Sequence, residues 1–112
     1  MPGGSNLGFG NIAFSSLIQA TLSPGITIPN SVSEQTYTIV GLQVGDAVSV
    51  SKPTVQSGIG IINARVSAKD TLAIGWMNNT GVTVTPTASE VYVIEVNRPN
   101  VPVGTALPGT FL

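Results

Sequence analysis

Five carboxylic acids are the main side chains of this sequence that could carry out chemistry. Enzymes that hydrolyse glycosidic bonds use two such groups, held about 5 to 10 Å apart on either side of the scissile bond. Here the acids are scattered over turns and strand faces, and they are Glu34, Asp46, Asp70, Glu90 and Glu95. No motif groups them, so a catalytic pair depends entirely on the fold. A hydrolase is therefore an alternative that the sequence does not favour.

Most other active sites lack their residues altogether. The chain has no Cys and no His, which excludes thiolate nucleophiles, His acid–base catalysis and the commonest zinc ligands. Gly58-Ile59-Gly60 lacks the third glycine and the helix of a phosphate-binding loop, so it predicts a bulge or tight bend. Asn78-Asn79-Thr80 matches a glycosylation sequon but is typical of a turn. We expect no enzyme activity, no catalytic residue, no cofactor and no metal.

The charge balance narrows the class of partner. The chain has 112 residues, of which only 8% are charged, and its net charge is −1. This is about a third of the usual charged share, and it gives no electrostatic footprint for nucleic acid or for a membrane surface. A low-charge surface is typical of protein that faces other protein. We therefore expect an obligate assembly.

Alternating residues separated by turn residues predict about seven short strands and no amphipathic helix. The clearest strand has Ile62, Ala64, Val66 and Ala68 on one face and Asn63, Arg65 and Ser67 on the other. The expected strands cover residues 17–22, 34–40, 47–51, 59–68, 71–77, 82–84 and 91–96, with a further short edge piece at 26–28.

Strand faces and turns place several side chains. Leu72, Ile74 and Trp76 are expected to point inward, with the indole N–H of Trp76 at the edge of the core. Residues 68–70 predict a tight hairpin connection, across which Arg65 is expected to pair with Asp70.

The spacing of these strands is typical of an all-β fold, a single antiparallel β-sandwich or jelly-roll-like domain with extended arms at both ends. Residues 1–14 form the expected Gly-rich N-terminal arm, 15–98 the domain, and 99–112 the Pro-rich C-terminal arm. The large apolar side chains of the arms are candidate anchors for a partner, and they are Phe9, Phe14, Phe111 and Leu112.

Five segments of the sequence resemble a module of small structural proteins from tailed bacteriophages. They are EQTYTIVGL (34–42), VGDAVSV (44–50), ARVSA (64–68), DTL (70–72) and NNT (78–80), within a similar stretch of roughly residues 20–99. The resemblance implies a capsid decoration or cement protein, which binds the outside of the capsid and reinforces contacts between major capsid protein subunits. It also implies a homo-oligomer, a dimer or a trimer.

These observations agree with each other, because a cement protein needs no catalysis and benefits from a surface that is easily desolvated. The start of the chain has no basic region of a secretory signal, and no apolar run is long enough for a membrane span. We expect synthesis in the cytoplasm of a bacterial host and a final location on the virion. A module of a tail or head fibre that binds a host receptor or glycan remains the alternative.

Overall fold

The computed structural model describes residues 11–100 and 103–104, and within them the chain is all-β, as predicted. These residues form no helix, and hence none that is long and apolar enough to cross a membrane. Six strands follow each other along the described chain: β1 (Ile12–Leu22), β2 (Ser31–Thr38), β3 (Ala47–Ser51), β4 (Ile59–Ala68), β5 (Thr71–Asn78) and β6 (Glu90–Pro99).

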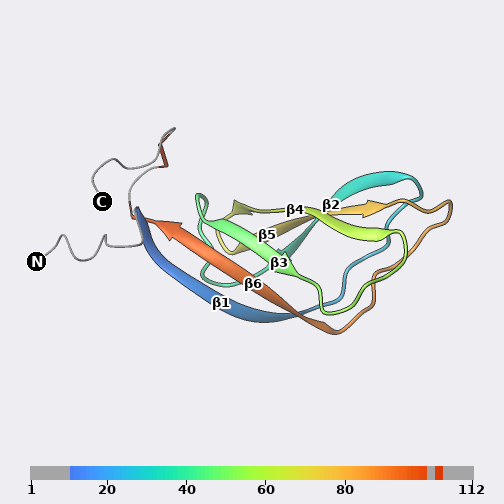
Figure 1. Ribbon diagram of the computed structural model, residues 1–112, viewed down its shortest axis with the longest axis horizontal. Coiled ribbons are helices and arrows are strands. Elements are labelled where there is room, and N and C mark those ends of the chain that lie inside the picture. Colours follow the sequence, from blue (N-terminus) through green and yellow to red (C-terminus); the bar gives the residue numbers. More distant parts are fainter. Residues whose placement is uncertain (1–10, 101–102, 105–112) are drawn as a thin grey trace, which may run out of the picture.

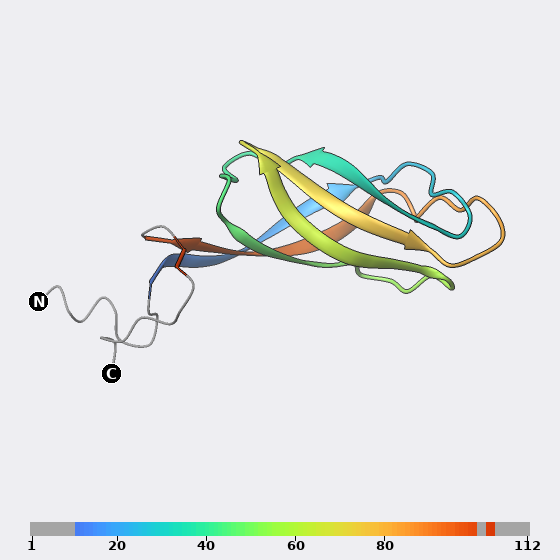
Figure 2. The ribbon, with the colours of Figure 1, turned by 90° about the horizontal axis from the view of Figure 1, so that it is seen from above.

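The strands form two antiparallel sheets of three strands each, with the orders β1-β6-β3 and β2-β5-β4 (Figure 1). Figure 2 shows the β2-β5-β4 sheet with β1 and β6 running behind it. Among the described strands, only β4 and β5 form a local hairpin, joined by the predicted turn at Lys69 and Asp70. Every other pairing joins strands distant in sequence. The two middle strands, β5 and β6, therefore carry most of the core.

One hydrophobic cluster contains residues from both sheets. The inward row predicted for β5 is confirmed, because Leu72, Ile74 and Trp76 are fully buried. On β6, Tyr92 and Ile94 are also fully buried. A strand turns successive side chains to opposite faces, so these two patterns each supply one inward row.

The buried aromatic side chains differ in whether their polar atoms form hydrogen bonds. Trp76 Nε1 donates to the Tyr37 hydroxyl at 3.0 Å, and that hydroxyl donates to Gln35 Oε1 at 3.0 Å. The ring of Tyr92 meets Trp76 edge to face, with centroids 6.5 Å apart. The Tyr92 hydroxyl is buried without a hydrogen-bond partner among the described residues, and burial raises its pKa to about 12.

Two of the expected strands are too short to form. Residues 26–28 and 82–84 meet only in one bridge, in which Thr27 and Val84 exchange backbone hydrogen bonds of 2.7 and 3.1 Å. Prolines flank both segments, at 24, 29 and 86, and proline cannot donate to a ladder. The described residues thus contain six strands where about seven were predicted. The first strand is longer than expected, since β1 begins at Ile12 and not at residue 17.

The predicted face of Ile62 was wrong, because β4 contains a β-bulge at this point. The register of β4 against β5 shifts between Ile61 and Asn63, so that Ile61 lies opposite Trp76 and packs against the core. Ile62 is 52% exposed on the other face. An extra residue in one strand reverses the direction of the side chains that follow it.

Candidate partner-binding site

Only one of the four predicted anchors lies in the described part of the chain. Phe14 belongs to β1, not to an arm, and its side chain is 42% exposed. Phe9, Phe111 and Leu112 lie outside the described residues. The candidate site is therefore the surface around Phe14.

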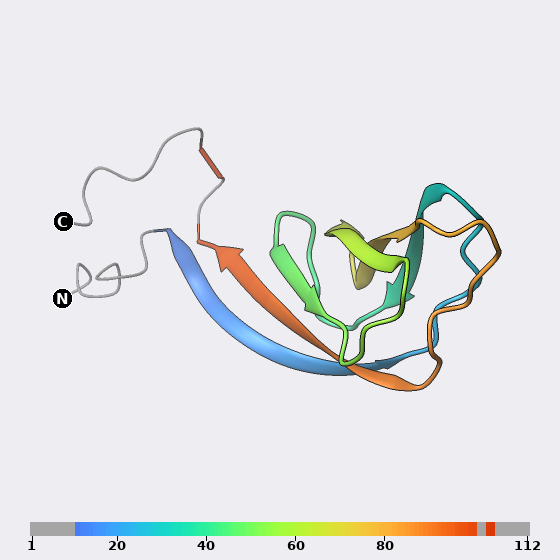
Figure 3. The same ribbon diagram turned by 45° about the vertical axis from the view of Figure 1, so that its right-hand side comes forward.

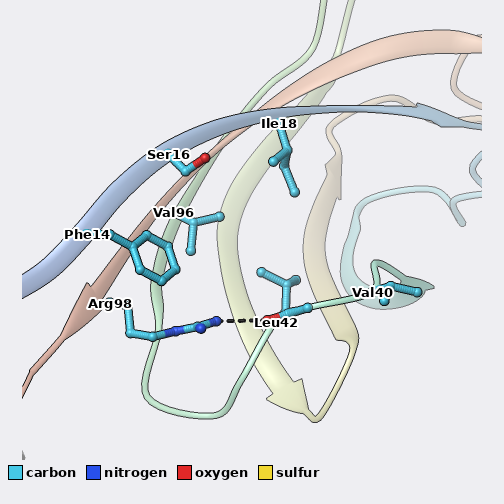
Figure 4. Close-up of a pocket in the computed structure, with 8 residues that line it drawn as sticks. Phe14, Ser16, Ile18, Val40, Leu42, Val96 and Arg98 are labelled. Atoms are coloured by element: carbon cyan, nitrogen blue, oxygen red, sulfur yellow. Dashed lines mark hydrogen bonds between the residues drawn. The ribbon is translucent and has the colours of Figure 1, made fainter.

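Phe14 lines a hollow of about 170 Å³ between the β1-β6 pair and the loop that follows β2 (Figure 4). The walls come from β1 and β6 on one side and from the loop on the other. They consist of Phe14, Ser16, Ile18, Val40, Gly41, Leu42, Val96 and Arg98.

Arg98 links the two walls of the hollow. Its Nε and Nη2 donate to the two carboxylate oxygens of Asp46, each at 2.8 Å, and Nη2 also donates to the Gly41 carbonyl at 2.8 Å. The guanidinium lies 4.6 Å from the ring centroid of Phe14, within the range of a cation–π contact. Arg98 thus holds the aromatic wall and the loop in a fixed relation.

The charges of this pair are neutralised inside the site. The Asp46 side chain is only 2% exposed, and it also accepts the Gln43 N–H at 2.9 Å. The hydrogen bonds from Arg98 lower the pKa of Asp46, and the Asp46 carboxylate raises the pKa of Arg98. Both groups stay ionised at neutral pH and face each other, so the hollow presents little net charge.

The loop wall is fixed from its other side by Asp70. The Asp70 carboxylate accepts the Gly41 N–H at 2.8 Å, and the Asp70 N–H donates to the Leu42 carbonyl at 2.9 Å. Leu42 is 2% exposed and anchors the loop in the core. Gly41 has a φ of +102°, which favours glycine. Because these bonds are made within the chain, the hollow is preformed.

The contents of the hollow indicate what it is able to bind. Its polar side chains are the Ser16 hydroxyl and the paired Arg98, so it offers neither a free acid nor a free base. An apolar cavity of about 150 Å³ accommodates benzene. A hollow of this size and character has room for one apolar or aromatic side chain.

The remaining acids serve other structural contacts. Arg65 makes a bidentate ion pair with Glu34 of β2, with both bonds at 2.8 Å, so the predicted pairing with Asp70 was wrong. Asp70 lies in the hairpin turn with a φ of +58°, and its carboxylate binds the loop instead. The hydrogen bonds from Arg65 lower the pKa of Glu34.

A third ion pair joins the end of β3 to the start of β6. Lys52 Nζ donates to Glu90 at 2.9 Å, and both side chains are 11% exposed. Thr54 Oγ1 donates to the same carboxylate at 2.6 Å, and this bond, with that from Lys52, lowers the pKa of Glu90. Among the described residues no three His, Cys, Asp or Glu side chains gather as a metal-binding group.

The two turn motifs have structural roles. Gly58 has a φ of +76°, and a Cβ there would collide with Thr80 Cγ2, which explains the predicted tight bend. Asn78 is 1% exposed and its side chain binds four backbone or hydroxyl groups around the predicted turn.

Sequence reasoning missed the roles of Asp46 and Arg98, because 51 residues separate them. A local signal for Asp46 existed, since an Asp that ends a Gly-containing turn is suited to accept a nearby backbone N–H. For Arg98 there was none, because its partners belong to β1 and to the loop after β2.

Fold and site together define an all-β protein of two three-stranded antiparallel sheets with a preformed, charge-neutral apolar hollow. Comparison with known proteins found no matching family model, no similar curated protein and no similar solved structure.

Proposed function

We propose that this protein is a non-enzymatic structural protein of a phage virion, which binds the outside of the capsid and reinforces contacts between major capsid protein subunits. The two sheets around one core are interpreted as a small β-sandwich that acts as a rigid binding module. The sequence resemblance to phage structural proteins is the reason for choosing a capsid as the partner. A surface with few charged residues, most of them ion-paired, is the structural observation that supports it.

Ion pairing accounts for that surface. Nine residues of the chain are charged, and six of them form three ion pairs within the fold. Thirteen large apolar side chains are exposed among the described residues. Charged groups are depleted in the cores of protein interfaces, because a charge must be desolvated when the partner covers it. Such a surface is suited to being covered by protein.

The hollow supplies the specific contact in this proposal. An apolar side chain of a capsid subunit enters it against Phe14 and Leu42, while Arg98 and Asp46 keep its walls in place. Interfaces depend on a few well-packed anchors surrounded by contacts that exclude water. Repetition of such a site on a capsid with many identical subunits, and in several copies of this chain, makes weak single contacts sufficient.

The test is to mix purified protein with capsid shells that lack it and to measure co-sedimentation. We expect saturable binding near one assembly per capsomer and shells that survive a higher temperature. Phe14→Ala is expected to weaken binding by about 1–2 kcal/mol, or roughly 5- to 30-fold, as for a partly buried anchor. Val55→Ala removes a side chain that is 96% exposed and serves as the matched control.

Chains lacking residues 1–10 or 105–112 test the anchors Phe9, Phe111 and Leu112 in the same assay. Unchanged occupancy for both truncations would remove these three residues from the proposal. Absence of binding to shells would contradict the capsid role, and binding to host cells or to a glycan array would then favour a fibre module.

A further inference from the structure

The outer edge of β1 has no partner strand among the described residues. β1 pairs with β6 from Ile12 to Leu22, and no other described strand lies on its far side (Figure 3). Alternate residues of an edge strand direct their N–H and C=O groups away from the sheet. With 11 residues, β1 is also the longest of the described strands. It is therefore a long template for another strand.

The other three edges carry features that discourage pairing. β4 has two register shifts and carries Arg65, and β2 carries Glu34. β3 has only five residues and is followed by Lys52-Pro53. Bulges, charges, proline and short length are the usual means by which proteins protect sheet edges.

β1 has almost none of these protections. Its 11 residues include no charged residue and no proline, and its register against β6 is regular from Phe14 to Leu22. An exposed strand of this kind associates with another strand unless something covers it. The contrast with the other edges indicates that this edge is meant to be covered.

One half of β1 is more exposed than is usual for a strand that packs on a core. Residues 13–17 are exposed without interruption, although alternate residues of a strand on a core are normally buried. Leu17 is 69% exposed on the outer face, and Phe14 is 42% exposed on the inner face. A strand added beside β1 pairs with its open edge and gives the side chains on both faces of this segment new cross-strand neighbours.

We propose that β1 pairs antiparallel with β1 of a second copy about a two-fold axis at Leu17. The result is one continuous six-stranded sheet, with the order β3-β6-β1-β1-β6-β3. This pairing deepens the assembly proposed above by naming the surface that joins two copies, but it rests on the strand edge and not on the capsid.

The sequence of β1 is self-complementary in this register. Leu17 is the middle residue of the strand and lies opposite itself, while Phe14 lies opposite Ala20 and Ser16 opposite Ile18. Inward residues thus meet inward residues, and the large Phe14 meets a small partner. No like charges meet, because the strand has none. A symmetric interface needs a patch that matches itself in this way.

A charge-swap experiment tests the two-fold axis. Sedimentation equilibrium of the full chain is expected to give twice the chain mass of 11.4 kDa at high micromolar concentration. Leu17→Lys and Leu17→Glu each place like charges against themselves, so each is expected to raise the dissociation constant about a hundredfold. An equimolar mixture of the two variants is expected to restore the dimer. Val55→Lys is the control and leaves the mass unchanged.

Cross-linking provides a second measurement. Directly opposite residues in an antiparallel pair have Cα atoms about 4.5 or 5.5 Å apart, which suits a disulfide. The chain has no cysteine, so Leu17→Cys introduces a single thiol. We expect oxidation to link two copies rapidly for Leu17→Cys and not for Val55→Cys, which lies in a loop outside the strand.

The possible results distinguish a failure of the strand pairing from a failure of the capsid role. A chain that stays monomeric at high micromolar concentration, or a dimer that persists in both Leu17 charge variants, would overturn the pairing. Emission of the single residue Trp76 shows whether each variant is folded. Shells are absent from these measurements, so a dimer that fails to bind shells contradicts only the capsid role.

Discussion

Replacement of Asn78 by Asp tests how strongly a buried amide holds the loops at the end of β5. Asn78 is 1% exposed. Its Nδ2 donates to the carbonyls of Thr27 at 3.1 Å and Val82 at 2.9 Å. Its Oδ1 accepts the Thr80 N–H at 2.9 Å and the Thr80 hydroxyl at 2.6 Å. All four hydrogen-bonding positions of the amide are therefore occupied.

Asn78→Asp keeps the shape of the side chain but turns its donor into an acceptor. At neutral pH a carboxylate oxygen then faces two carbonyl oxygens in a buried site, which favours the protonated acid. If the folded pKa rises from about 3.9 to about 6–7, then at about 1.36 kcal/mol per pKa unit the variant loses about 3–4 kcal/mol at neutral pH.

The sign of the pH dependence follows from this raised pKa. Protonation supplies an O–H that donates to a carbonyl again, so the folded variant binds its proton more tightly than the unfolded chain. The loss of stability is complete above the folded pKa, shrinks as the pH falls through it, and is small below the unfolded pKa of about 3.9.

Urea unfolding followed by Trp76 emission measures the effect. The quantity to compare is the difference in unfolding free energy between variant and wild type at neutral pH and near pH 4.5. Asn79→Asp is the matched control, because Asn79 is the exposed neighbour. A difference that is absent, or that does not shrink in acid, would refute the assigned role of the Asn78 amide.

Three further perturbations follow from the structure. Leu72→Ala, at a fully buried position, is expected to lower the unfolding free energy by about 3–5 kcal/mol; a loss below about 1 kcal/mol in urea titration would mean that the core collapses onto the cavity. Gly58→Ala is expected to lower the unfolding free energy by about 1–3 kcal/mol because of the positive φ, and by more because the new Cβ collides with Thr80. Combining it with Thr80→Ser, which removes the colliding methyl, is expected to recover part of this loss. The lowered pKa of Asp46 predicts stability that is present above the unfolded pKa of about 3.9 and is lost as the pH falls through the folded pKa; Asp46→Asn is expected to flatten this acid limb in thermal unfolding, and an unchanged limb would contradict it.

Local alternation predicted the inward rows correctly, because the direction of a side chain in a regular strand depends only on its position in that strand. This holds for the buried row of β5. It failed for Ile62, where one extra residue in β4 reverses the faces. A bulge depends on the partner strand as well as on its own sequence, so periodicity alone does not reveal it.

Partners across strands were harder to predict than faces. Asp70 is five residues from Arg65 and was the expected partner, yet Arg65 binds Glu34, 31 residues away. The sheet order β2-β5-β4 places β2 and β4 on either side of β5, and local sequence does not contain that order. The hollow was missed for the same reason, since β1, β6 and the loop after β2 form it jointly.

The ion pair of Arg65 with Glu34 depends on the small residues of β5 that lie beneath it. Arg65 lies opposite Ala73 and Glu34 lies opposite Gly75, so the two long side chains meet across the middle strand. Ala73 is fully buried although it is on the outer face of the sheet. A larger side chain at Ala73 would occupy the space through which the pair forms.

Ala73→Leu is therefore expected to separate Arg65 from Glu34 and to lower the unfolding free energy by about 1–3 kcal/mol through overpacking. The pKa of Glu34 is expected to rise toward its ordinary value, because the hydrogen bonds from Arg65 that lower it are lost. Titration of Glu34 by NMR measures this rise. Ala47→Leu makes the same change at an exposed position of β3 and is expected to leave Glu34 unaffected. A Glu34 pKa that stays low in Ala73→Leu would show that the pair spans β5 without needing a small residue beneath it.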